Sequence, residues 1–210
     1  MEKIGQFVKP ETTLNLILPS LTTGGGGLST FRIGCLRALQ GVLKGTSSVD
    51  LSSHLHNLLA TLSDRELVQN ESLAVMEELA KCLLFVGQKL SPQSGSLFEF
   101  FYILVQLQSF PGDDKVVGWT SLQNTVNLAL LEHSKCLGTS LENLYLQHLD
   151  QGLQNLSQSF TTWNQYSSEP RTFQTLLFKN SANFGEKLGT FLPIVTECTA
   201  AEKDFELRER

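Results

Sequence analysis

Apolar residues recur at helical spacing along almost the whole chain, and polar turn residues interrupt them about every twenty residues. In residues 55–62, leucines stand at i, i+3, i+4 and i+7, on one face of a helix. No segment alternates with period two for long enough to form a strand, so the sequence predicts an all-α protein of eight or nine helices. The expected helices cover about 11–23, 29–44, 50–62, 70–84, 97–110, 116–133, 140–163 and 173–178, and a further segment follows near residue 193.

Polar residues at the starts of these segments are candidate helix caps, because their side-chain oxygens can accept hydrogen bonds from free backbone N–H groups. The candidates are Ser29 or Thr30, Asp50 or Ser52, and Asn70. Residues 97–110 are apolar around most of the helical circumference, so we expect this helix to be the most buried one.

A Leu-Pro pair occurs in an apolar run near each end of the chain, and an arginine with a second apolar pattern follows about a dozen residues later. The two copies are residues 16–21 with 31–39, and residues 191–195 with 204–208. A proline late in a helix bends it, and a second helix that folds back completes a two-helix unit. This pattern resembles the HEAT repeat, which has a proline in its first helix and an arginine at the start of its second.

The predicted helices fit either a globular bundle or a solenoid in which each hairpin contacts only its neighbours. The helix pairs repeat about every forty residues, which is the period of HEAT and armadillo repeats and favours the solenoid. The resemblance implies a right-handed α-α superhelix. We therefore expect residues 1–210 to form one solenoid segment of about four to five hairpins, least regular over 97–133, where the proline and arginine are missing.

The last residues, 206–210, stand where the second helix of a repeat would begin. A solenoid normally ends in a polar capping repeat, because an open stack leaves an apolar face in water. The sequence therefore predicts a piece of a longer array, and dimerisation through its open ends is a second expectation.

Charge, hydropathy and cysteine content exclude several classes of protein function for this chain. The 210 residues carry a net charge of -5 and no cluster of lysine and arginine, which argues against nucleic-acid binding. The longest apolar stretch, 97–107, is too short to span a bilayer, and the first residues lack the features of a signal peptide. The four cysteines include no Cys-x-x-Cys pair and are expected to be small buried thiols in a reducing compartment. We therefore expect a cytoplasmic protein.

Residues that could carry catalysis or bind a metal do not converge in the sequence. His54 and His56 lie on different faces of a helix. His133 and Cys136 are close enough to meet, but zinc needs three or four ligands. Glycines 24–27 lack the Gly-Lys-[Ser/Thr] sequence of a phosphate loop and are expected to form an inter-helix turn. The sequence predicts neither an enzyme nor a bound cofactor or metal.

Trp163 and Tyr166 are the candidate partner-binding residues. Aromatic residues are frequent among the residues that dominate binding energy, and these two stand where the apolar pattern fades into polar residues. Aromatic residues of repeat proteins more often pack between hairpins, and this is the favoured interpretation of the aromatic residues here. If any of them are exposed, the position of Trp163 and Tyr166 makes them the pair to expect.

Within the HEAT and armadillo group, the chain resembles the HEAT-repeat axonemal dynein assembly factors. The similar parts are residues 5–12 leading into 14–21, the run Leu-Glu-Asn-Leu-Tyr-Leu-Gln-His-Leu at 141–149, and Phe-Leu-Pro at 191–193. The resemblance implies a non-catalytic cytoplasmic scaffold that helps to preassemble axonemal dynein arms, with dynein subunits and chaperones as partners. It does not identify individual binding residues.

Two other functions of a solenoid remain as alternatives. An importin-like transport receptor would bind basic cargo on an acidic surface, which the net charge permits, although the acidic residues are scattered. A tubulin-binding array is a weaker alternative, because it would need basic loops that this chain lacks.

Overall fold

The computed structural model describes residues 10–22, 28–70, 72–112, 116–164, 167–181, 185 and 188–199. Within these ranges the chain forms helices, turns and loops and contains no strand. The all-α prediction is therefore confirmed for the described part. None of the helices found there combines the length and apolar character that a membrane crossing requires.

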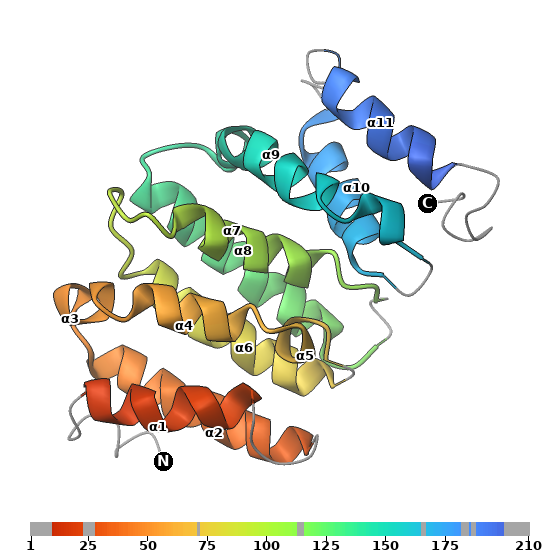
Figure 1. The fold of residues 1–210 in the computed structure, drawn as a ribbon. Helices are drawn as coiled ribbons and strands as arrows, with labels where there is room; N and C mark the ends of the chain where they lie inside the picture. Colours follow the sequence, from red (N-terminus) through yellow and green to blue (C-terminus); the bar gives the residue numbers. More distant parts are fainter. Residues whose placement is uncertain are drawn as a thin grey trace.

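The helices form antiparallel pairs that are stacked from one end of the molecule to the other (Figure 1). The successive pairs are α1 (Pro10–Thr22) with α2 (Ser29–Gly45), α4 (Leu55–Leu62) with α6 (Leu73–Gly87), α7 (Leu97–Gln108) with α8 (Trp119–Cys136), and α9 (Leu141–Ser157) with α10 (Glu169–Lys179). The short helices α3 (Ser48–Ser52) and α5 (Arg65–Val68) flank α4, the 3₁₀ helix η2 (Phe160–Thr162) follows α9, and α11 (Leu188–Cys198) lies at the end of the stack.

Two rows of helices run along the stack. In one row α1 packs on α4, α4 on α7 and α7 on α9, and in the other α2 packs on α6 and α6 on α8. The last pair departs from this regularity, because α10 packs mainly against α7 and α9. Each pair contacts its immediate neighbours, so the chain is an all-α HEAT-type solenoid. The right-handed superhelix stays a prediction.

The core lies between the two rows and consists mainly of leucines at helical spacing. Leu55, Leu58, Leu59 and Leu62 of α4 are all buried, as their spacing predicts. Burial of this many apolar side chains is the main term that stabilises the stack.

The most buried helix is α6, so the prediction that residues 97–110 would be most buried is wrong. Nine of the 15 residues of α6 are buried, compared with six of the 12 residues of α7. The reason is the central position of α6 in the stack. Helices α2 and α8 pack on two of its sides, and α5 and α7 cover part of its remaining surface. Apolar composition alone did not reveal this.

Two predicted helices are shorter in the structure. The segment 50–62 is divided into α3 and α4, and the Oγ atom of Ser47 caps α3 by accepting from the N–H of Asp50. The segment 140–163 ends as an α-helix at Ser157, and Ser140 caps its start.

The other proposed caps are also displaced. Ser29 and Thr30 lie inside α2, which is preceded by Leu28. The residue before α6 is Ser72, whose N–H donates to the Oδ1 atom of Asn70. Serine, threonine and asparagine can bond locally in several ways, so residue type did not fix the cap position.

Both Leu-Pro pairs lie within helices, Pro19 in α1 and Pro193 in α11. The arginine that follows the first pair, Arg32, is buried in α2 and forms an ion pair with Glu66 of α5. The HEAT-like arginine therefore ties the first helix pair to the second. Its counterpart, Arg208, lies outside the described residues, and so do glycines 24–27.

Candidate functional site

Glu78 forms a buried polar junction between α2 and α6. Its Oε2 atom accepts from Gln40 Nε2 at 2.7 Å, and its Oε1 atom lies 3.2 Å from Arg37 and 3.3 Å from Lys81. Gln40 Nε2 also donates to the backbone oxygen of Glu78 at 3.1 Å. One carboxylate therefore holds two neighbouring helices at a fixed register.

Burial alone would raise the pKa of the Glu78 carboxyl. The hydrogen bonds from Gln40, Arg37 and Lys81 and the positive charge of Lys81 outweigh it, and the pKa of Glu78 is lowered. Glu78 is consequently a charged structural residue at neutral pH, with no tendency to act as a proton donor.

The polar contacts continue from α6 to α8. Lys81 Nζ lies 3.0 Å from Glu77 Oε1, which also accepts from Ser121 Oγ at 2.9 Å. Leu128 stands two helical turns after Ser121 and is 52% exposed. We call this surface, defined by Arg37, Glu77, Lys81, Ser121 and Leu128, the α2–α6–α8 face.

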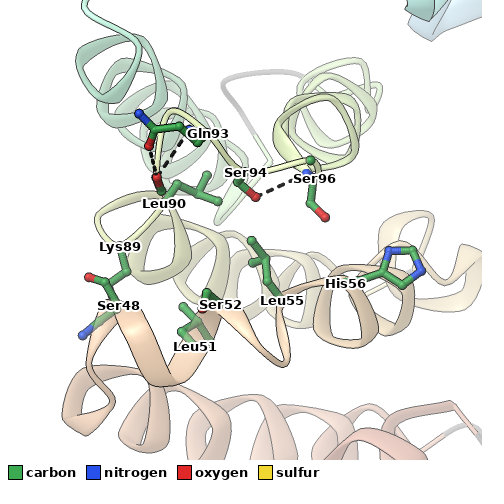
Figure 2. A pocket seen from close by; sticks show the side chains of 12 residues that line it. Ser48, Leu51, Ser52, Leu55, His56, Lys89, Leu90, Gln93, Ser94 and Ser96 are labelled. Atoms are coloured by element: carbon green, nitrogen blue, oxygen red, sulfur yellow. Dashed lines mark hydrogen bonds between the residues drawn. The ribbon is translucent and has the colours of Figure 1, made fainter.

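A cavity of about 500 Å³ opens between α3–α4 and the loop that joins α6 to α7. Figure 2 shows Leu51 and Leu55 on its lower wall and Leu90 on its upper wall. Serine hydroxyls border these leucines, and we call this cavity the Leu/Ser pocket. The serines are Ser48, Ser52, Ser91, Ser94 and Ser96.

Local hydrogen bonds hold the upper wall of the Leu/Ser pocket in place. The N–H of Ser94 donates to the backbone oxygen of Ser91 at 3.0 Å, and the N–H of Ser96 donates to Ser94 Oγ at 3.3 Å. Lys89 Nζ donates to the backbone oxygen of Thr46, which ties the loop to the end of α2. The two walls thus belong to segments about forty residues apart that are joined by a direct contact.

The two ends of the Leu/Ser pocket differ in charge. Lys89 stands at one end, and His56 at the other lies 3.5 Å from Glu99 Oε2 through its Nδ1 atom. No carboxylate is among the described side chains that line the pocket. A ligand that enters near Lys89 therefore meets a positive charge.

His133 and His148 are buried together between α7, α8 and α9. Their rings are stacked with centroids 5.8 Å apart, and Phe100 meets His133 edge-on at 5.1 Å. Burial and, as a smaller cause, the neighbouring His148 together lower the pKa of His133 to about 4. Neither ring nitrogen of His133 has a hydrogen-bond partner, so the pair is neutral packing at pH 7.

His133 and Cys136 do not form a site together. The Sγ atom of Cys136 donates to the backbone oxygen of Leu90 at 3.0 Å, while His133 faces Phe100 and His148. In the described part of the chain, no group of three or more His, Cys, Asp or Glu residues has metal-binding geometry. Cys35, Cys82, Cys136 and Cys198 are free thiols, and only Cys82 among them is fully buried.

Trp163 is buried, as the packing interpretation of the aromatic residues expects, so its side chain is not available on the surface as a partner-binding residue. It is 3% exposed, its ring lies 6.1 Å from that of Phe173, and its Nε1 atom donates to Ser159 Oγ at 3.2 Å. The specific pairing with Phe173 could not be read from the sequence, because Phe173 belongs to a separate helix, α10. Tyr166 lies outside the described residues.

The Leu/Ser pocket was missed by sequence reasoning. Its lower leucines belong to the predicted core face of a helix, and residues 91–95 were interpreted only as a break between helices. The one available signal was the density of serines in both segments, which has no specific spacing.

Comparison with known proteins agrees with this fold. The chain is similar to curated proteins named dynein axonemal assembly factor 5, with 29% identity to that of Xenopus laevis, 25% to that of Homo sapiens and 28% to that of Mus musculus. In each case the similarity covers 99% of this chain but only 24%, 23% and 23% of the relative, so the chain spans about a quarter of their length. No solved structure matches.

A sequence model of the family described as "Dynein axonemal assembly factor 5, HEAT-repeat domain" matches residues 1–110, more than half of the chain. The matched part contains the first two helix pairs, α7 and both walls of the Leu/Ser pocket. The chain therefore belongs to the family of the dynein axonemal assembly factor 5 HEAT-repeat domain.

Proposed function

We propose that this chain is a non-catalytic scaffold that holds axonemal dynein subunits, together with chaperones, during their preassembly in the cytoplasm. Membership of the dynein axonemal assembly factor 5 HEAT-repeat family carries the proposal. The solenoid fold supports it, because stacked helix pairs present long surfaces to other proteins. Residues 1–210 act in this proposal as one stretch of α-solenoid.

The α2–α6–α8 face is the part of the solenoid that we assign to partner binding. An ion pair joins α2 to α6 and a hydrogen bond from Ser121 to Glu77 joins α8 to α6, so these contacts hold the three helices in fixed relative positions. Leu128 and Leu131 lie further along α8 and are 52% and 41% exposed. A rigid polar surface with exposed apolar side chains is suited to a protein partner.

The importin-like alternative has less support on this face. Each of its carboxylates is engaged, because Glu77 and Glu78 both pair with Lys81 and Glu78 also pairs with Arg37. A receptor for basic cargo needs carboxylates that remain available to the cargo.

The test is to immobilise the chain and pass lysates from ciliating and from non-ciliated cells over it, with retained proteins identified by quantitative mass spectrometry. Retention of axonemal dynein chains, with or without chaperones, from ciliating cells alone is the expected result. Retention of basic nuclear proteins or a small GTPase from both lysates would support the transport receptor instead.

A matched pair of double variants then tests the assigned face. Leu128→Ser with Leu131→Ser is expected to reduce dynein retention about tenfold, because exposed apolar side chains at the centre of an interface dominate its energy. Leu16→Ser with Leu192→Ser removes two leucines of α1 and α11 that are 69% and 56% exposed, and should leave retention unchanged. Equal losses in both double variants would remove the α2–α6–α8 face from the proposal.

A further inference from the structure

The Leu/Ser pocket has features of a peptide-binding site that the proposed scaffold function does not use. Its volume of about 500 Å³ exceeds that of one leucine side chain and lies within the range of ligand sites. Its floor is apolar and its border is rich in hydroxyl groups. A few well-placed polar groups around an apolar floor are what fix the orientation of a bound ligand.

The apolar floor calls for an aliphatic side chain in the ligand. Leu51 and Leu55 approach from one wall and Leu90 from the other, so a side chain inserted between them is in contact with leucines on both sides (Figure 2). Such burial removes apolar surface from water without leaving a polar atom unpaired.

The positive charge of Lys89 at one end of the pocket favours a ligand that carries a carboxylate. The ammonium group of Lys89 has three N–H donors, and its bond to the backbone oxygen of Thr46 uses one of them. That bond also keeps the side chain at the pocket edge instead of extended into solvent. At the opposite end Glu99 stands beside His56, so a second acidic group on the ligand is not favoured there.

The serine hydroxyls suit a peptide backbone. Ser94 Oγ accepts from the N–H of Ser96, and its own hydroxyl hydrogen can donate to a C=O group of an extended chain. We propose that the Leu/Ser pocket binds a short peptide segment of another protein in which an aliphatic residue, seated between Leu51, Leu55 and Leu90, is followed by an Asp or Glu residue that pairs with Lys89. The proposal depends on the pocket alone and does not require that the partner is a dynein subunit.

The first experiment screens the purified chain against a phage-displayed library of random twelve-residue peptides. The expected result is enrichment of Leu, Ile or Met with Asp or Glu within the next three residues. Enrichment of basic peptides, or no enrichment over an unrelated helical protein, would overturn the proposal.

The second experiment measures the affinity of the most enriched peptide, labelled with fluorescein, by anisotropy. Replacing its acidic residue with the corresponding amide should weaken binding about tenfold, and Lys89→Gln in the protein should have the same effect. The two changes together should weaken binding little more than either alone, because they remove the same ion pair. Additive losses would show that Lys89 does not contact the carboxylate.

A blocking variant keeps the test valid if Lys89→Gln disturbs the loop. A Cβ atom added at Gly95, which lines the pocket, meets no atom within 4 Å, so the backbone there accepts a side chain and Gly95→Phe is designed to fill the pocket space. We expect it to reduce affinity at least about tenfold with an unchanged circular dichroism spectrum. Lys135→Gln and Gly189→Phe, at an exposed lysine and an open glycine elsewhere, are the controls and should bind as the wild type does. Equal affinity of the Gly95→Phe variant and the wild type would overturn the assignment of the pocket.

Discussion

At the scale of single residues, the charge of Glu78 holds α2 and α6 together. It is 6% exposed and holds Gln40, Arg37 and Lys81 through its two carboxylate oxygens. A buried carboxylate is stabilising only while these donors surround it. Its single-residue variants should therefore report on the contact between α2 and α6.

Glu78→Gln keeps the volume of the side chain and removes its charge. We expect the free energy of unfolding at pH 7 to fall by about 1–3 kcal/mol, because the bonds to charged donors are lost. Folding lowers the pKa of Glu78, so its contribution is present above the ordinary carboxyl pKa of 4.5 and disappears as the pH falls through the folded value. Urea titrations followed by circular dichroism at pH 7 and pH 3 measure both effects.

The control for this variant is Glu132→Gln, which breaks a more exposed pair with Lys135 at 2.7 Å. It should change stability by less than about 0.5 kcal/mol. A loss in Glu78→Gln that is equally large at pH 3 would contradict the role of the charge.

His133 makes the stack sensitive to mild acid. Its pKa is near 4 in the folded chain and near 6.5 when exposed, so between these values the unfolded state binds more protons and stability falls as the pH is lowered. We expect the wild type to lose about 1–2 kcal/mol between pH 7 and pH 5 from this residue. His133→Leu should lose correspondingly less over the same interval, as measured by urea titration.

The same pH dependence in the wild type and in His133→Leu would show that His133 is not responsible. The sequence suggested His133 only as a neighbour of Cys136. Its actual partner, His148, lies in another helix and was not identifiable from spacing.

At the scale of secondary-structure elements, the sequence correctly predicted the helix ends that are marked by proline or glycine. The start of α1 at Pro10 and the end of α2 at Gly45 agree with the sequence because proline and glycine each have a specific backbone effect. The break between α3 and α4 at residues 53–54 was not predicted, since serine and histidine carry no such signal. The burial of Trp163 likewise depends on α10, which folds back over it.

The contact between α9 and α10 depends on a glycine. A Cβ atom at Gly152 would lie 3.0 Å from Leu176 Cδ1, so the two helices approach at a point that tolerates little added volume. Gly152→Val should lower the free energy of unfolding by about 1–3 kcal/mol through overpacking, measured as a lower thermal midpoint. Gly189→Val, at a position with open space, should not lower it. Equal thermal midpoints for Gly152→Val and the wild type would mean that α9 and α10 can move apart without a loss of stability.

At the scale of the whole molecule, stability should vary along the stack. The central helices α6 and α8 pack against neighbours on several sides, whereas α1 and α11 lie at its two ends. In a solenoid each pair is stabilised by its neighbours, so the ends open most easily.

Hydrogen exchange measures this gradient directly. Amides of α6 and α8 should exchange most slowly, and those of α1 and α11 should exchange fastest. Uniform protection from α1 to α11 would instead indicate that the chain opens only as one cooperative unit.

The fluorescence of the two tryptophans of the chain can also show whether the stack unfolds in one transition or from its end. Trp119 begins α8 in the third helix pair, whereas Trp163 is packed against Phe173 near the end of the stack. Replacing either one with phenylalanine leaves a single fluorophore that reports one region. Emission changes at the same urea concentration would mark a single transition, and separate midpoints would reveal a chain that melts from its end, with Trp163 as the first indole to reach water.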